Sequence, residues 1–205
     1  NKILQKQQDR IHIIKLTVFS NYSPNIECQH CGQKNLNMLS IDHINGGGNK
    51  HKNRERIRGG WNLYNWIKKH DFPSGFQVLC MNCQYIKKSE NHEDASRERK
   101  YTSRRKQGQR WAFKLKMGVL NHYSSNGVPE CMSCDNHDIR VLCIHHVNQH
   151  GNKHRKEVNG NFYNWLKVNR YPSGYKVLCA NCHQIENLSG TRKIQQSSMS
   201  TLDIE

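Results

Sequence analysis

The sequence contains the same unit twice. The segments NYSPNIECQHC, SIDHINGGGNKH and YNWIKKHDFPSGFQVLCMNC recur in the same order as HYSSNGVPECMSC, CIHHVNQHGNKH and YNWLKVNRYPSGYKVLCANC. Early matches, such as Cys28 with Cys131, lie 103 residues apart, and later ones, such as Cys80 with Cys179, lie 99 apart. A repeat of this length in a chain of 205 residues predicts two copies of one small domain rather than a single large one.

The repeat sets the expected domain boundaries. We expect one module in residues 1–95, a second in residues 96–190 and a flexible, serine-rich tail in residues 191–205. The segment 86–110 has almost no apolar periodicity, so its middle is the expected linker. The second copy lacks four residues that the first contains within residues 52–62. Because surface loops tolerate changes of length, we expect a surface loop there.

Local patterns predict a mixed α+β fold in each copy. Short β-prone runs precede the glycine- or asparagine-containing loop, and QVLC and KVLC are typical of a second strand. Apolar residues at helical spacing indicate a helix at 61–70 and another at 162–169. A further helix is expected after the last cysteine of each copy. The predicted order is strand, loop with an inserted helix, strand, helix.

The cysteines form four C-x-x-C pairs, two in each copy. The pairs of a copy are separated by 48 residues in the first and 44 in the second. Thiolates at this spacing favour a closed, tetrahedral, structural Zn²⁺ site, which would stabilise a small core. Paired disulfides are the alternative, and they would require an oxidising compartment. The predicted zinc ligands are Cys28, Cys31, Cys80, Cys83, Cys131, Cys134, Cys179 and Cys182. Cys143 has no counterpart in the first copy, and we expect a buried core thiol.

Composition limits the setting and the partner. Hydrophobic residues make up 35%, and no stretch of sequence resembles a membrane span or a signal peptide, so we expect an intracellular protein in a reducing compartment. The formal net charge of +16 is typical of proteins that bind polyanions. Solvated basic faces, or attraction to an anionic membrane, are the alternatives. The candidates for contacts with a nucleic-acid backbone are Arg54, Arg56, Arg58, Arg104, Arg105 and Arg110.

A second group of residues suggests hydrolytic chemistry. Asp42 and His43 are adjacent on the first expected strand, and His145 and His146 occupy the same positions in the second copy. A metal ligand beside an imidazole suits phosphodiester hydrolysis, because one residue can hold a divalent cation while its neighbour takes a proton from water.

These motifs resemble the zinc-containing HNH endonucleases common in phage and mobile genetic elements. The resemblance rests on DHINGGGNKH followed by YNWIKKHDFPSGFQVLCMNC and on their counterparts, and it covers roughly residues 16–90 and 117–188. It implies two tandem ββα-metal (HNH, or His-Me finger) modules. It further implies that His43 and His146 are general bases.

The resemblance also implies which residues bind the catalytic metal. Asp42 and His145 would be ligands, with His183 as the final ligand of the second copy. Gln84 stands where the family has His or Asn, so the first site is expected to be weakened or inactive. Two loop glycines of the first copy are replaced by Gln149 and His150 in the second.

The expected function is that of a metal-dependent endonuclease. It would hydrolyse phosphodiester bonds of double-stranded DNA with Mg²⁺ or another divalent metal, mainly through the second module. The alternative is a catalytically inactive HNH-derived protein that binds DNA or structured RNA within a larger assembly, such as a ribonucleoprotein. His51 and His154, in the shared NKH triplet, would contact phosphate, orient the site or pack within the loop.

Overall fold

The structure is a computed structural model of the chain. It describes residues 2–90, 103–148, 151–158 and 160–189. Contacts divide the chain into two compact units, Asn1–Glu93 and Asp94–Glu205, called modules 1 and 2 below. The predicted boundary near residue 95 and the predicted tail lie outside the described residues. Helices occupy both ends of the segment 86–110, so only residues 91–102 remain for the predicted linker.

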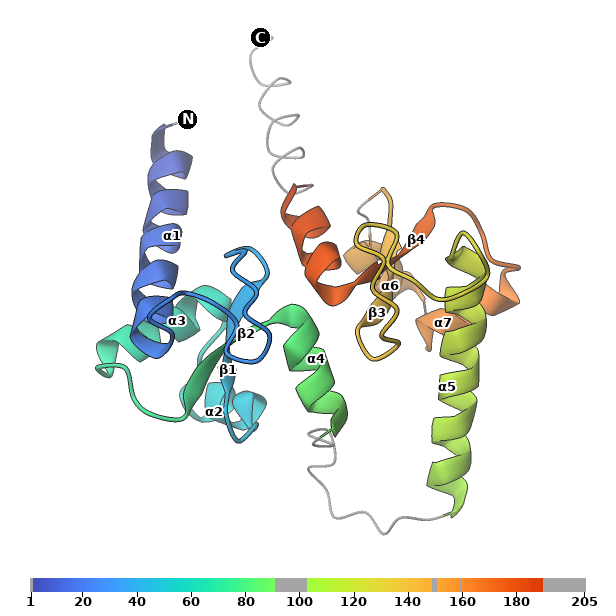
Figure 1. Cartoon of the computed structure of the whole chain (residues 1–205), viewed down its shortest axis with the longest axis horizontal. Coiled ribbons are helices and arrows are strands. Elements are labelled where there is room, and N and C mark those ends of the chain that lie inside the picture. Colours follow the sequence, from blue (N-terminus) through green and yellow to red (C-terminus); the bar gives the residue numbers. More distant parts are fainter. Residues whose placement is uncertain (1, 91–102, 149–150, 159, 190–205) are drawn as a thin grey trace. The chain divides into compact units, whose positions relative to one another are not determined.

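Module 1 consists of helices around one two-stranded antiparallel sheet, called the hairpin below (Figure 1). Its elements are α1 (Lys2–Tyr22), β1 (Leu39–His43), α2 (Gly48–Arg54), α3 (Gly59–Lys69), β2 (Phe76–Cys80) and α4 (Met81–Glu90). Strands β1 and β2 are antiparallel, with Ile41 opposite Val78 and Asp42 opposite Gln77. Helix α4 follows β2 directly and packs against the hairpin.

Module 2 repeats this arrangement. Its elements are α5 (Ser103–Tyr123), β3 (Leu142–His146), α6 (Gly151–Glu157), α7 (Phe162–Val168) and β4 (Tyr175–Cys179), followed by helical residues 180–189. Strands β3 and β4 are antiparallel, with His145 opposite Lys176 and His146 opposite Tyr175. The predicted strands and the helices after them are therefore present in both modules, and each module has the mixed α+β character predicted.

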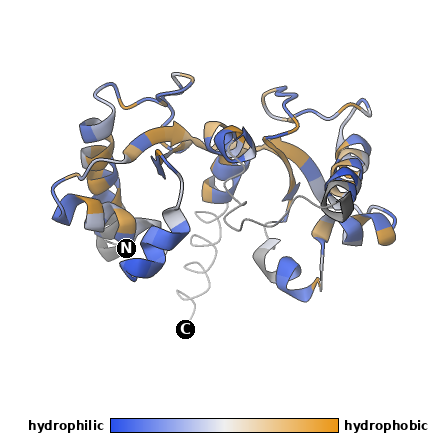
Figure 2. Ribbon diagram, turned by 90° about the horizontal axis from the view of Figure 1, so that it is seen from below, coloured by the Kyte–Doolittle hydropathy of each residue, from blue (hydrophilic) through white to orange (hydrophobic). Residues whose placement is uncertain are grey.

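Each core lies between the hairpin and the long first helix of the module. Val18 and Phe19 of α1 are fully buried, as are Val119 and Leu120 of α5. Both hairpins carry mostly hydrophobic residues with hydrophilic ones between them (Figure 2). Helix α1 packs against α3 and β2, and α5 packs against α7 and β4. The sequence analysis did not predict these two long helices.

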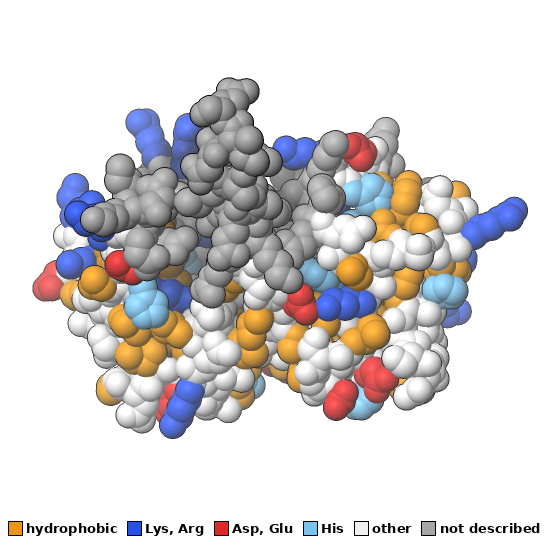
Figure 3. Space-filling view, turned by 90° about the horizontal axis from the view of Figure 1, so that it is seen from above, with side chains coloured by type: hydrophobic (Ala, Val, Ile, Leu, Met, Phe, Trp, Pro, Cys, Tyr) orange, Lys and Arg blue, Asp and Glu red, His pale blue; other side chains and the backbone are white. Residues whose placement is uncertain are grey.

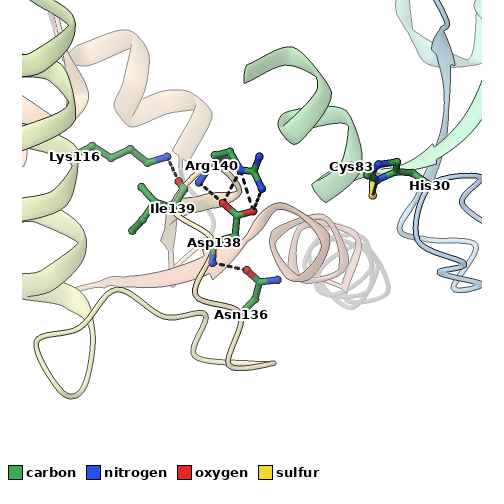
Figure 4. Close-up of polar contacts among 7 residues, drawn as sticks. All are labelled: His30, Cys83, Lys116, Asn136, Asp138, Ile139 and Arg140. Carbon is green, nitrogen blue, oxygen red and sulfur yellow. Dashed lines mark hydrogen bonds and ion pairs between the residues drawn. The ribbon is translucent and has the colours of Figure 1, made fainter. Parts of the chain in front are cut away.

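A lysine fixes each long helix to the loop after the first C-x-x-C pair. The ammonium of Lys15 donates a hydrogen bond to the carbonyl of Leu36 at 2.7 Å. Figure 4 shows the equivalent bond of module 2, in which Lys116 donates to the carbonyl of Ile139 at 2.6 Å. Burial lowers the pKa of Lys15 to about 8 and also lowers that of Lys116. The two lysines hold equivalent positions, so the contact belongs to the repeated unit.

Residues 55–58 lie outside the helices, but the expectation of a surface loop through the whole segment 52–62 is wrong. This segment contains the end of α2 and the first turn of α3. Helix α3 has 11 residues and α7 has 7, and α7 begins at Phe162, the equivalent of Leu63. Four residues are about one helical turn. The difference in length therefore shortens a helix by one turn and leaves its buried face in register.

No helix in the described part of the chain is long and apolar enough to cross a membrane.

Candidate functional site

The four cysteines of each module converge at one end of its hairpin. In module 1, Cys28 and Cys31 lie in a turn after α1, Cys80 ends β2, and Cys83 lies in the first turn of α4. The backbone of Gln29 hydrogen-bonds to the carbonyl of Val78 at 3.0 Å, which joins this turn to β2. In module 2 the equivalent bond, between Met132 and Val177, also measures 3.0 Å.

The geometry of both cysteine groups fits zinc. The four Sγ atoms of each group lie within 4.8 Å of one another. The Sγ atoms of Cys31 and Cys80 are 3.7 Å apart, and those of Cys134 and Cys179 are also 3.7 Å apart. A tetrahedron with Zn–S bonds of about 2.3 Å has edges of about 3.8 Å. All nine cysteines of the chain are free thiols in the structure. Two closed, structural zinc sites fit these residues.

The environment of the thiols differs within a site. Burial, together with the neighbouring thiols, raises the pKa of Cys83 and of Cys182. Burial also opposes ionisation of Cys28, but backbone hydrogen bonds at Cys80, His30 and Cys31 outweigh it and lower the pKa of Cys28. Four thiolates in so small a space require a cation. In module 1 the ring of His30 lies beside Cys83, with Nδ1 3.4 Å from Sγ (Figure 4).

The two predicted general bases lie at the ends of β1 and β3, and each contacts a second histidine. Nε2 of His43 lies 2.9 Å from Nδ1 of His51, and Nε2 of His146 lies 3.1 Å from Nδ1 of His154. The second histidine is held in turn by a tryptophan, at a centroid distance of 4.4 Å in both modules. Of the roles open for His51 and His154, these contacts fit both orientation of the site and packing within the loop.

A glycine lies against each of these predicted bases. A Cβ atom on Gly48 would lie 3.0 Å from Nδ1 of His43, and one on Gly151 would lie 2.9 Å from Nδ1 of His146. Neither glycine has a positive φ, so space is the reason for glycine at these positions. Gly48 is the one member of its three-glycine run that the second copy retains. The sequence analysis missed its role, although this selective retention was a usable signal.

The predicted metal ligands of module 2 lie together. The ring of His145, on β3, lies edge-on to the ring of His183, with centroids 5.1 Å apart. His145 is 2% exposed, and its Nδ1 is a buried nitrogen without a hydrogen-bond partner among the described residues. Nδ1 of His183 lies 3.2 Å from the amide nitrogen of Asn187. Two imidazoles with an unsatisfied buried nitrogen fit a metal ion that needs nitrogen ligands.

The corresponding residues of module 1 are arranged differently. Asp42 accepts hydrogen bonds from Gln77 at 2.8 Å and from the ammonium of Lys87 at 2.6 Å. Lys87 also donates to the carbonyl of His43 at 2.5 Å. The amide of Gln84 donates to the carbonyl of Leu79. The predicted ligand Asp42 is therefore paired with Lys87. The other predicted ligand, Gln84, hydrogen-bonds through its amide nitrogen to a backbone carbonyl.

The histidines of the sites favour the neutral state. Burial, with positive charge from neighbouring groups, lowers the pKa of His146 to about 4 and that of His183 to about 4. Burial is also the main cause that lowers the pKa of His145 and His43. A neutral imidazole can accept a proton from water or bind a metal ion, so both proposed roles are open to these side chains.

The arginines predicted to contact nucleic acid lie from the end of α2 to the start of α3 in module 1 and along α5 in module 2. Arg54, Arg56, Arg58 and Arg110 are exposed, and Arg54 pairs with Glu55 at 2.8 Å. Arg104 and Arg105 lie in α5, but their side chains are outside the described part of the structure. Lysine and arginine side chains project at several separate places on the face drawn in Figure 3.

Comparison with known protein families, with curated proteins and with solved structures finds no match to this chain.

Proposed function

We propose that the protein is a metal-dependent endonuclease whose second module cleaves phosphodiester bonds of DNA. The observation that supports this most is the contact of His145 with His183, beside the base predicted at the next position of β3, His146. The ring of His145 lies against the ring of His183. The ring of His146, the next residue of β3, is positioned by His154. A structural zinc site, a metal-ligand pair and a positioned base are the parts that an HNH nuclease requires.

Each residue of module 2 has a distinct role in this proposal. His145 and His183 would hold a divalent cation, which when bound would supply positive charge to a phosphodiester and its leaving oxygen. Imidazole ligands favour a transition metal ion over Mg²⁺. His146 takes a proton from the attacking water, and His154 keeps the ring of His146 in place. The basic surface of the chain attracts the DNA backbone.

Module 1 has a different role in the same proposal. Its His43 and His51 have the same geometry as His146 and His154, but Asp42 is paired with Lys87. We assign to module 1 the binding of nucleic acid without cleavage. The pairing of Asp42 with Lys87 is the observation that supports this part of the alternative function, a catalytically inactive HNH-derived module.

A plasmid-cleavage assay tests the proposed function. The protein is purified with its zinc, and supercoiled DNA is incubated with it in EDTA, Mg²⁺, Mn²⁺, Ni²⁺ or Co²⁺. We expect cleavage with at least one transition metal and none in EDTA. A double variant, His145→Ala with His183→Ala, should bind DNA with unchanged affinity and fail to cleave it. DNA binding without cleavage under any of these metals would favour the silent alternative for both modules.

A further inference from the structure

Four equivalent positions, one of them the predicted metal ligand on the first strand, make up the site of each module, and the lysine and the carboxylate stand at different positions in the two modules. Module 1 has Asp42, Gln77, Gln84 and Lys87, and module 2 has His145, Lys176, His183 and Glu186 in the same order. Each set contains one lysine and one carboxylate. In module 1 the carboxylate is on the first strand and the lysine on the last helix. In module 2 the lysine is on the second strand and the carboxylate on the last helix.

This difference determines which residues form the ion pair and which side chains remain able to bind a metal ion. In module 2, Lys176 binds Glu186 at 2.8 Å, so the ion pair involves neither His145 nor His183. In module 1 the ion pair includes the predicted metal ligand itself, because Lys87 binds Asp42 at 2.6 Å. The side chains of Lys87 and Asp42 are only 15% and 16% exposed, so solvent screens this pair weakly.

The ammonium of Lys87 stands where a cation bound to Asp42 would be needed. It contacts the carboxylate of Asp42 and the backbone carbonyl of the predicted base, His43. Oxygen atoms of these kinds are ligands that hard divalent cations take. Such a cation would have to displace the ammonium from both oxygens, or approach it against repulsion between like charges.

We propose that Lys87 is a built-in substitute for the metal ion of module 1, so that this module takes up zinc at its cysteines but no second cation. The ammonium of Lys87 balances the charge of Asp42, so the site of module 1 stays folded without a metal ion. The module is then inactive because Lys87 occupies the position of the cation, and not only because Gln84 replaces one ligand. The contrast with module 2 rests on the proposed function, whereas the exclusion of metal from module 1 rests only on the contacts of Lys87.

Paramagnetic broadening by Mn²⁺ tests this on the zinc-loaded, full-length protein. Mn²⁺ accepts oxygen and nitrogen ligands and is the weakest competitor for thiolate sites among the first-row divalent metals. NMR signals close to a bound Mn²⁺ ion disappear, so the two modules are read separately. In the wild type we expect the signals of Asp42 and His43 to persist at Mn²⁺ concentrations that remove those of His145 and His183.

Two variants complete the test. Lys87→Glu places a second carboxylate beside Asp42, and we expect Mn²⁺ then to remove the signals of Asp42 and His43. Lys88→Glu, at the next and exposed position of α4, makes the same change of net charge and should leave them intact. Zinc content confirms that both variants are folded.

The outcomes separate this inference from the proposed function. Broadening at Asp42 in the wild type, or no broadening there in Lys87→Glu, would overturn the role of Lys87. A wild type in which Mn²⁺ leaves His145 and His183 untouched would count against the proposed function, while the signals of Asp42 would still decide the inference.

Discussion

Nδ1 of His154 lies 3.1 Å from Nε2 of His146 and 3.2 Å from the hydroxyl of Tyr175. A His146 ring that is protonated at Nε2 donates to the single lone pair of this nitrogen, and the tyrosine hydroxyl then shares the same lone pair. Nδ1 of His146 then has the lone pair that takes a proton. In module 1 the tyrosine is replaced by Phe76, so the equivalent pair of histidines lacks the hydroxyl.

Replacing His154 should therefore lower activity without removing the base. The variant His154→Ala leaves His146 unoriented, and loss of a group that orients a functional histidine typically costs about 10–100-fold. The measurement is the initial rate of plasmid cleavage. His51→Ala is the matched control, because it removes the equivalent histidine from module 1 and should leave the rate nearly unchanged. Equal losses in the two variants would mean that these histidines act on folding alone.

The space beside Nδ1 of His146 should also be necessary. In Gly151→Ala the new methyl group would lie 2.9 Å from that nitrogen, so the ring must shift or the approaching water must be excluded. We expect loss of most cleavage, whereas Gly48→Ala makes the same change at His43 and should have little effect. Circular dichroism and zinc content control for folding. Full activity of Gly151→Ala would show that the proton is taken at another atom.

The cysteine groups should bind two zinc ions per chain. Apparent binding free energies of structural zinc are on the order of 10–16 kcal/mol, as large as the whole stability of a typical domain, which is about 5–15 kcal/mol. Cys131→Ser should therefore unfold module 2 and reduce the zinc content to one ion, with module 1 still folded. Elemental analysis and amide NMR spectra measure both effects. A folded, metal-free protein with oxidised cysteines would contradict the zinc sites.

Affinity for DNA should fall steeply with salt. Each phosphate neutralised by a lysine or arginine releases condensed counterions, so log K declines with log salt in proportion to the number of contacts. Fluorescence anisotropy with a labelled duplex at several salt concentrations gives the slope. A labelled RNA hairpin and anionic lipid vesicles are useful comparisons. A flat response with DNA would mean that the net charge of +16 serves another purpose.

The repeated parts of the sequence allowed the most secure predictions. The hairpins, the helices beside them and the convergence of the cysteines follow from patterns that occur twice at fixed offsets. The long helices α1 and α5 were missed because their core contacts, such as Val18 and Phe19, are concentrated near their C-terminal ends. These helices depend on tertiary packing more than on a local pattern.

The differences between the two sites were harder to read. The partner of Asp42 is Lys87, 45 residues further along the chain, and its reach depends on how α4 packs on the hairpin. Glu186 stands at the equivalent position in module 2, so comparison of the two copies indicated no shared role for this position. Gln84 predicted a weakened first site, and the structure places its amide nitrogen on the carbonyl of Leu79. The arginines were chosen from charge alone, and charge does not determine which of them lie on one face.

The relative effect of two substitutions tests the central claim most directly. Loss of a positioned general base typically costs on the order of 10² to 10⁴ in rate, so His146→Ala should lower plasmid cleavage by about that factor. His43→Ala should leave the rate nearly unchanged, because the proposed function assigns no cleavage to module 1. Both variants should retain two zinc ions, since neither histidine is a predicted zinc ligand. A greater loss in His43→Ala, or unchanged cleavage in His146→Ala, would contradict the assignment of catalysis to module 2.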